Sequence, residues 1–121
     1  MTLTVLAVDD SRTMRDLLRV ALAPRGFDVH LATDGEDALE VLASIAPDVI
    51  ITDINMPRLD GFGLIANLRA REHTRRTPII VLTTESAPEL RERARSAGAT
   101  GWIVKPFDEA KLVAAVRRVA G

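Results

Sequence analysis

The sequence of 121 residues contains no cysteine, and this absence excludes disulfide bonds and thiolate chemistry. It also lacks the basic segment and apolar core of a secretory signal. No apolar run approaches the roughly 18 residues that are needed to span a bilayer. We therefore expect a cytoplasmic protein without membrane insertion.

Neither sign of charge dominates the chain. Sixteen basic and seventeen acidic residues leave a net charge of -1, and the arginines are scattered rather than gathered in one block. This distribution disfavours nucleic-acid binding, which needs a basic face or stripe. With 47% hydrophobic residues the chain can bury one core. We expect a single domain over residues 1–121, a monomer without an output domain.

Short apolar runs alternate with helical patterns five times along the sequence. The apolar runs cover residues 3–8, 27–32, 49–52, 79–82 and 101–104. Nearly uninterrupted runs of this length are typical of parallel strands that are buried on both faces. Five β-α units with right-handed crossovers predict an α/β fold in which helices cover both faces of one parallel sheet.

The segments between these runs contain residues that are typical of helix starts and helix ends. Ser11, Asp34 and Asp108 are expected to cap three of the helices. The segment 24–26 and Pro47 are expected to stop the first and second helices. The apolar residues that recur at helical spacing, and that we expect to face the core, are Met14, Leu17, Leu18, Ala21, Leu22, Ala38, Leu39, Leu42, Ile45, Leu64, Ile65, Leu68, Leu112, Val116 and Val119.

The fourth helical segment is the most polar of the five. Ser86 and Glu89 match a capping box at its start, and Gly98 is expected to end it. Leu90 is its only large apolar residue. With so little apolar surface to bury, this helix is expected to be mobile.

Polar residues stand where four of the predicted strands end. Asp9 and Asp10 follow the first strand, Asp53 the third, Thr83 the fourth and Lys105 the fifth. Because ligands bind outside the carboxyl ends of parallel strands, we expect these side chains to converge. Two carboxylates about 4 Å apart repel by roughly 4 kcal/mol at an effective dielectric of about 20, so the cluster must protonate or hold a cation. Carboxylate, carbonyl and phosphate oxygens are ligands that Mg2+ prefers, which predicts a magnesium site with Lys105 as a phosphate clamp.

Each of these residues also has a purely structural interpretation. The acidic pair can simply favour the start of a helix, and Asp53 can form a turn. Lys105 can be a solvated surface lysine, and threonine is common in strands. None of these interpretations explains why all four kinds of residue stand at the same edge of the sheet. Lys105 is also one of only two lysines in the chain, which hints that its compact point charge matters.

Four motifs, in order, carry a resemblance to a known family. They are Asp9-Asp10, the loop from Asp53 through Met56-Pro57 to Asp60-Gly61, Thr83-Thr84, and Lys105-Pro106-Phe107. Over essentially the whole chain they resemble the receiver domain of two-component response regulators. The resemblance implies a flavodoxin-like fold, a five-stranded parallel sheet of order 2-1-3-4-5 with five helices on both faces.

The resemblance also implies a catalytic role and a metal for the acidic residues. Asp53 would be the phosphoacceptor, which attacks a phosphohistidine or an acyl phosphate as a carboxylate nucleophile. Asp10 and Asp53 would ligate Mg2+ directly, together with the backbone carbonyl of Asn55, and Asp9 would hold a metal-bound water. The protein would then be no true enzyme but a signalling phosphoacceptor that assists its own phosphorylation and dephosphorylation.

Two further residues would contact the phosphoryl group. Thr83 would donate its hydroxyl and Lys105 its ammonium to phosphoryl oxygens, and the Lys105-Pro106 bond is expected to be cis as in the family. The added phosphoryl charge would draw Thr83 inward and let an aromatic residue follow. Trp102 stands where the family keeps this aromatic switch, although it can equally be a tryptophan that only covers the sheet edge.

The output face is expected on the fourth helix, the fifth strand and the fifth helix. The arginines of the fourth helix can belong to this face or be merely solvated. Within the family, Asn55 and Glu85 match residue choices of free-standing chemotaxis regulators of the CheY type, as does the stretch 100–107. Asn55 and Glu85 would flank the path of attacking water and tune the rate of dephosphorylation.

Three functions follow from these expectations. The first is a phosphorylation-switched signalling protein in chemotaxis, which a sensor histidine kinase phosphorylates and which binds a partner such as the flagellar motor switch protein or a phosphatase. The second is a phosphate sink without an output partner. The third, an aspartate-nucleophile phosphohydrolase, is disfavoured because Asn55 occupies the position two residues after Asp53, where such enzymes carry a second aspartate.

Overall fold

The computed structural model describes residues 2–121, and within this range five strands alternate with five α-helices. The strands are β1 (Thr4–Val8), β2 (Asp28–Ala32), β3 (Val49–Thr52), β4 (Ile79–Thr83) and β5 (Gly101–Val104). The helices are α1 (Arg12–Leu22), α2 (Gly35–Val41), α3 (Gly61–Ala70), α4 (Pro88–Ala97) and α5 (Glu109–Ala120), with a short 3-10 helix η1 (Ala23–Arg25) after α1. None of the helices in this range is both long and apolar enough to cross a membrane.

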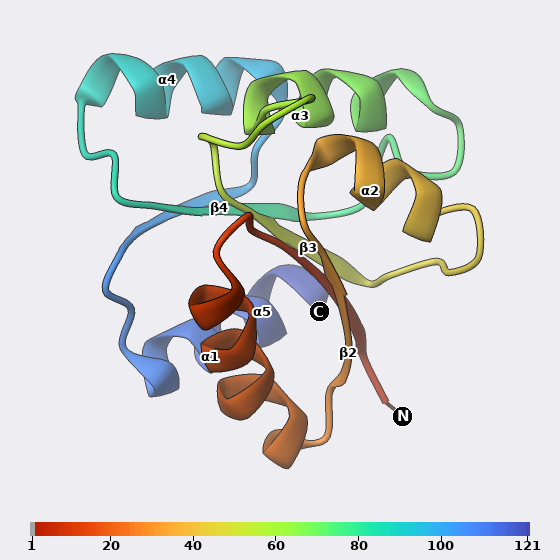
Figure 1. The fold of residues 1–121 in the computed structure, drawn as a ribbon, viewed down its shortest axis with the longest axis vertical. Coiled ribbons are helices and arrows are strands. Elements are labelled where there is room, and N and C mark those ends of the chain that lie inside the picture. The colour runs from red at the N-terminus through yellow and green to blue at the C-terminus, as the bar shows by residue number, and fades with distance from the viewer. Residues whose placement is uncertain (1) are drawn as a thin grey trace.

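The strands form one parallel sheet in the order β2-β1-β3-β4-β5 (Figure 1). The chain therefore winds from β1 to β2 in one direction and from β3 to β5 in the other. The direction of winding reverses between β1 and β3, and in sheets of this kind ligands bind outside the strand ends at such a reversal. The predicted fold class and strand order are confirmed.

Helices cover both faces of the sheet, as predicted (Figure 1). Along β1, Leu6 and Val8 pack into a core with residues of α2, α3 and α4, whereas Val5 and Ala7 pack into a second core with residues of α1 and α5. Because both faces of the central strands are covered, the residues that point to either face have to be apolar. This burial on both faces explains why the strand sequences are nearly continuous apolar runs.

The helix caps fix how the chain leaves each strand. Ser11, Asp34 and Asp108 each accept a hydrogen bond from the backbone N–H three residues later, at 3.2, 2.9 and 2.9 Å, so these predicted N-caps are confirmed. Gly98 ends α4 with a φ of 114°, a left-handed conformation that a residue without Cβ adopts easily.

The capping box predicted at Ser86 and Glu89 is wrong. The N-cap of α4 is Ala87, which makes no side-chain cap, and the helix begins at Pro88. Proline favours the first helical position and holds the residue before it in an extended conformation, so the helix starts directly after Ala87. Ser86 then lies one residue too early to cap it.

Three other details differ from the predictions. Leu17 is 48% exposed, because Leu18, Ala21 and Leu22 form the buried stripe of α1 and Leu17 lies beside it. Val119 of α5 is only partly buried. Two predicted strands begin one residue later and the fourth extends one residue further, to Thr83.

The second helix is also shorter than predicted. α2 ends at Val41, well before Pro47, because the N–H groups of Ala43 and Ser44 bond to carbonyls only three residues back and tighten the chain into turns. Ile45 therefore lies outside the helix, although it still packs against the core. The other predicted core positions are buried or partly buried.

Candidate functional site

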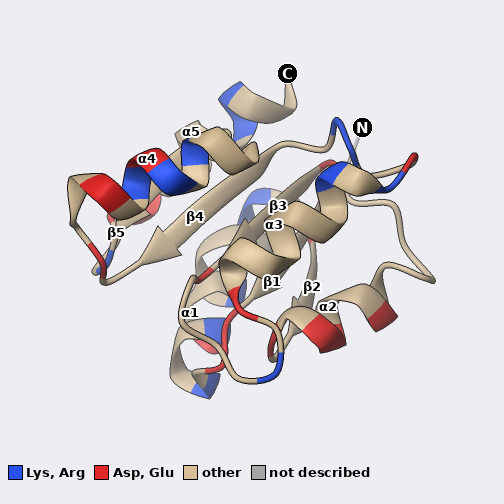
Figure 2. Ribbon diagram, turned by 90° about the horizontal axis from the view of Figure 1, so that it is seen from above, with Lys and Arg blue, Asp and Glu red and all other residues tan. Residues whose placement is uncertain are grey.

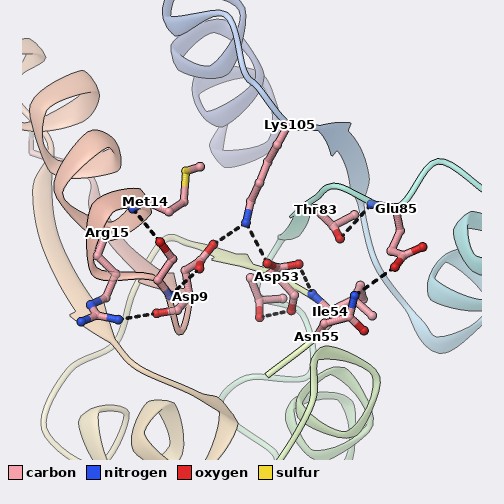
Figure 3. Close-up of polar contacts among 11 residues, drawn as sticks. Asp9, Met14, Arg15, Asp53, Ile54, Asn55, Thr83, Glu85 and Lys105 are labelled. Atoms are coloured by element: carbon pink, nitrogen blue, oxygen red, sulfur yellow. Dashed lines mark hydrogen bonds and ion pairs between the residues drawn. The ribbon is translucent and has the colours of Figure 1, made fainter. Parts of the chain in front are cut away.

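Polar side chains at the ends of four strands lie together at one edge of the sheet (Figure 3). Asp53 follows β3, and its N–H donates to the carbonyl of Val8 at 3.0 Å, which holds it beside the end of β1 and Asp9. Lys105 follows β5, and its N–H donates to the carbonyl of Thr83 at 2.8 Å. The backbone ladder thus continues past the strands and brings their terminal side chains together.

Asp9, Asp10 and Asp53 form an acidic cluster in which one carboxylate oxygen of each lies within 4.8 Å of the others. Asp9 and Asp53 are buried, with 1% and 8% of their surface exposed, whereas Asp10 is exposed. Three carboxylates this close repel one another unless a cation compensates them. Their oxygens are hard donors of the kind that Mg2+ prefers, so the donor set fits this ion.

Lys105 reaches into the cluster between two of the acids (Figure 3). Its Nζ donates to Oδ2 of Asp53 at 2.7 Å and to Oδ2 of Asp9 at 2.8 Å. Burial by itself lowers the pKa of this ammonium, but the hydrogen bonds to Asp53 and Asp9 outweigh burial and raise the pKa above its ordinary value. Lys105 is therefore a protonated internal counter-ion. Its side chain is only 10% exposed, so the interpretation as a solvated surface lysine is wrong.

The backbone around the site holds the two buried carboxylates in place. The N–H of Ser11 donates to Oδ1 of Asp9 at 2.9 Å, and the N–H of Ile54 donates to Oδ1 of Asp53 at 2.6 Å. The remaining oxygen of each carboxylate is the one that meets Lys105. The Lys105-Pro106 peptide bond is cis, as the resemblance implied.

Thr83, Asn55 and Glu85 lie beside the acidic cluster. Thr83 is fully buried, and its Oγ1 accepts a hydrogen bond from the N–H of Glu85 at 3.2 Å. The side-chain amide of Asn55 donates to Oε1 of Glu85 at 3.1 Å, which links the loop after β3 to the loop after β4 (Figure 3). The two residues that the resemblance assigned to dephosphorylation therefore contact each other.

Trp102 lies on β5, outside the acidic cluster. It is partly buried and packs against the core beneath α2, α3 and α4. A cavity of about 350 Å³ adjoins it on the side of α4, where Arg91, Arg95 and Thr100 also line the space. Trp102 thus covers part of the sheet edge and also has open volume beside it.

Sequence reasoning did not find three residues that make side-chain contacts around the loops next to the site. Nη1 of Arg15 donates to the backbone carbonyl of Asp9 at 2.7 Å. Arg58, in the loop after Asp53, forms a two-pronged ion pair with Asp34. No spacing in the sequence separates Arg15 or Arg58 from the other scattered arginines, and Asp34 was recognised only as a helix cap.

The doubly wound sheet with an acidic cluster at its carboxyl edge defines a class of parallel α/β domains that bind their ligand at the point of reversal. Within that class, the family model of the response regulator receiver domain matches residues 5–117, so the chain belongs to this family. Receiver domains are signalling modules that histidine kinases phosphorylate on an aspartate, and they typically bind Mg2+.

Solved structures and curated proteins agree with this assignment. The chemotaxis response regulator CheY4 of Vibrio cholerae is 40% identical with a TM-score of 0.92, over 98% of this chain and 99% of that chain. The receiver domain of sensor histidine kinase PA1611 from Pseudomonas aeruginosa PAO1, which has a magnesium ion coordinated in its active site cleft, is 31% identical with a TM-score of 0.91, over 100% and 99% of the two chains. Response regulator MprA of Mycobacterium leprae is 41% identical over 113 residues, which are 93% of this chain and 49% of MprA. The chain spans half or less of the length of the curated relatives it matches.

Proposed function

We propose that this receiver domain accepts a phosphoryl group on Asp53 and uses it to control the binding of a partner in chemotaxis. The observation that carries the proposal is the contact of Asp53 with Lys105 at 2.7 Å inside a cluster of three carboxylates. A carboxylate held beside a protonated amine can be both a nucleophile and the anchor of a new anionic group.

In the reaction, a carboxylate oxygen of Asp53 attacks the phosphorus of a phosphohistidine. A new O–P bond forms, the N–P bond breaks, and the imidazole leaves with its bonding electron pair. Lys105 Nζ, already hydrogen-bonded to Asp53, is within reach of the new phosphoryl oxygens and offsets their charge. The hydroxyl of the buried Thr83, at the end of β4, donates to another of these oxygens.

Mg2+ fits beside these residues. Asp10 and Asp53 would hold it as direct ligands, with the backbone carbonyl of Asn55, and Asp9 would hold it through a water. The support is the cluster geometry, with one oxygen of each acid within 4.8 Å of the others. When bound there, Mg2+ would supply neutralisation of the charge on the transferring phosphoryl group.

Asn55 and Glu85 are assigned to the rate of dephosphorylation. Their hydrogen bond of 3.1 Å joins the loop that follows β3 to the loop that follows β4. The two residues would flank the path of the water that attacks the aspartyl phosphate. Substitution of either residue is expected to change the lifetime of the phosphoryl group.

The output face is assigned to α4, β5 and α5, with Thr83 and Trp102 as the switch. Trp102 lies on β5 and lines the same cavity as Arg91 and Arg95 of α4, so it has open volume beside it. Basic residues recur along α4, where blue and red segments alternate in Figure 2. An inward step of Thr83 toward the phosphoryl group would leave space that Trp102 can enter, and α4 would respond.

Chemotaxis is proposed because CheY4 is 40% identical and matches over 99% of its own chain. The corresponding partners would be a chemotaxis-type sensor histidine kinase and, for the output, a flagellar motor switch protein or a phosphatase. Residues 1–121 would act as one monomeric receiver unit in the cytoplasm.

The proposal is tested by loading the protein with acetyl phosphate and Mg2+. Trp102 is the only tryptophan, so its fluorescence reports on the switch, and mass spectrometry locates the labile adduct. We expect an adduct on Asp53, which hydroxylamine removes as it does other acyl phosphates, and a fluorescence change, both lost in Asp53→Asn. Asp60→Asn is the matched control, because Asp60 lies in the same loop but serves as the N-cap of α3, a role that asparagine keeps. An intact protein without an adduct on Asp53 would refute the proposal.

A second measurement separates partner binding from a phosphate sink. Purified motor switch protein is passed over immobilised protein with and without acetyl phosphate. Binding that requires phosphorylation and is weakened by a substitution of Trp102 supports the output face. Rapid loss of the phosphoryl group without phosphorylation-dependent binding would favour the sink.

A further inference from the structure

Arg58 has an unusual backbone conformation for its residue type. It lies in the loop of residues 53–60 between β3 and α3, and its φ is 65°. Among the residues that the structure describes, it is the one residue other than glycine with a positive φ. The left-handed region is unfavourable for a side chain with a Cβ, and glycine or asparagine is the usual choice there. An arginine at this position therefore needs a compensating interaction.

The compensation comes from Asp34 at the start of α2. Nε of Arg58 donates to Oδ2 of Asp34 at 2.8 Å, and Nη2 donates to Oδ1 at 2.9 Å. The side chain of Asp34 is only 7% exposed. The hydrogen bond from Arg58, followed by that from the N–H of Asp37, lowers the pKa of Asp34, so the pair is charged at neutral pH. Such a planar two-pronged pair is a geometry that lysine cannot reproduce.

Two backbone contacts hold the same loop in place. The N–H of Gly35 donates to the carbonyl of Leu59 at 3.0 Å. A Cβ on Gly35 would lie 2.5 Å from that carbonyl oxygen, so only glycine permits this approach. The N–H of Gly61 donates to the carbonyl of Ile54 at 2.8 Å and closes the loop on itself. The loop is thus tied to α2 next to the Arg58–Asp34 pair.

The other end of this loop forms the site. Asp53 begins the loop, and Asn55, three residues before Arg58, reaches Glu85 at 3.1 Å. We propose that Arg58 is a positioning residue. Its two-pronged ion pair with Asp34 holds the loop so that Asn55 stays beside the acidic cluster. In this way Arg58 sets the affinity of the site for a cation and the rate of phosphorylation. The inference rests on the proposed function, in which Asp53 is the acceptor and Asn55 supplies a carbonyl to Mg2+.

Arg58→Gly and Arg58→Lys test this inference. Glycine removes the two-pronged ion pair and also the strain of the positive φ. Lysine keeps the charge but cannot form the two-pronged pair. Arg76→Gly is the matched control, because Arg76 is exposed in the loop before β4, at the opposite edge of the sheet. Each variant is compared with the wild type by chemical denaturation, amide hydrogen exchange, Mg2+ titration followed by Trp102 fluorescence, and the rate of phosphorylation by acetyl phosphate.

We expect both Arg58 variants to bind Mg2+ about tenfold more weakly, the loss typical when a residue that orients a metal ligand is removed. Amides 54–59 should exchange faster and phosphorylation should slow, while the denaturation midpoint of Arg58→Gly stays near that of Arg76→Gly. Unchanged exchange and Mg2+ affinity would overturn the inference. A global loss of stability that accounts for the weaker binding would overturn it as well, because it would make Arg58 a general stabilising residue.

Asp34→Asn supplies an independent test, because asparagine can still cap α2 but cannot form the ion pair. It should reproduce the effect of Arg58→Gly, and the double variant should add little, since both changes break the same contact. Fully additive effects would overturn the inference. Hydrogen exchange needs no phosphodonor, so it tests the role of Arg58 even where the wild type fails to label Asp53, an outcome that would refute only the proposed function.

Discussion

The two sides of the site are held with unequal firmness. On the side of β1 and β3, nearly every strand residue is buried, and α1 is capped by Ser11 and anchored by three buried residues. On the side of β5, the strand residues are half-buried or exposed, while α4 lacks a side-chain cap and fully buries only Ala94. We call the side of β1, β3 and α1 the firm side and the side of β5 and α4 the loose side. The residues proposed for chemistry lie mainly on the firm side, and those proposed for switching lie toward the loose side.

This difference has a physical reason. Acidic residues that repel one another stay close only on a rigid frame, so the cluster has to be built where packing is strongest. A switch, in contrast, needs an element that can move at small cost, and such elements have few buried apolar contacts. In the proposed function, this arrangement would let a local change of charge at Asp53 shift α4 while the nucleophile remains in place.

The largest change in stability is expected when one apolar side chain is truncated on each side. Leu18→Ala, in the buried stripe of α1, should destabilise the protein by about 3 kcal/mol, because it leaves a cavity in a closed core. Leu90→Ala in α4 should cost only about 1 kcal/mol, because Leu90 is half-buried and α4 can relax around it. Chemical denaturation measures both values, and Val20→Ala on the exposed face of α1 serves as the control. Equal losses for Leu18 and Leu90 would contradict the comparison.

The same contrast affects what the sequence could predict for the helices but not for the strands. The strands of both sides were predicted within one residue, because each is a short, nearly unbroken apolar run. The start of α4 was missed, because Ser86 and Glu89 have the spacing of a capping box while Pro88 decides where the helix begins. With little apolar surface in α4, no periodic signal was available to correct this error.

For the site, the sequence identified the residues at the strand ends but not those that hold them. Asp9, Asp53 and Lys105 could be grouped because each follows a predicted strand, and parallel strands end at one edge. Arg58 and Asp34 are 24 residues apart in the sequence, and their pairing depends on a left-handed conformation of Arg58. An arginine in a sequence does not predict this conformation. Contacts of this kind come from tertiary structure and need coordinates to be found.

The next prediction concerns the electrostatic cost of the firm side. Asp10→Asn removes one of three neighbouring carboxylates, and it should stabilise the metal-free protein by about 1 kcal/mol, because Asp10 is exposed and solvent screens much of the repulsion. The same variant should lose most of the stabilisation that Mg2+ gives the wild type. Denaturation with EDTA and with Mg2+ measures both effects, and Asp16→Asn, exposed on α1, is the control. A metal-free protein that becomes less stable would contradict this account of the cluster.

A third prediction tightens the loose side. Ala87→Ser places a hydroxyl at the N-cap of α4, where the backbone is already extended, and should stabilise the protein by about 0.5 to 1 kcal/mol. Amides in the first turn of α4 should also exchange more slowly. Ala66→Ser, at an exposed interior position of α3, should give no such gain. If Ala87→Ser leaves both stability and exchange unchanged, the missing cap is not what makes α4 loose.

The smallest effect is expected from the ion pair that ties the firm side to α2. The hydrogen bond from Arg58 lowers the pKa of Asp34 in the folded protein, so the charged form of Asp34 contributes stability above its unfolded pKa and loses that contribution as the pH falls through its folded pKa. Asp34→Asn keeps the cap without the charge, so wild type and variant should differ in stability at pH 7. The difference should begin to shrink near the unfolded pKa of about 3.9 and disappear only below the lower folded pKa. Thermal unfolding across this range measures the convergence, and the difference should already be small at pH 7 in an Arg58→Gly background. A difference that widens toward low pH would mean that the charge of Asp34 opposes folding, and the loop would then be held by the contact between Gly35 and Leu59 alone.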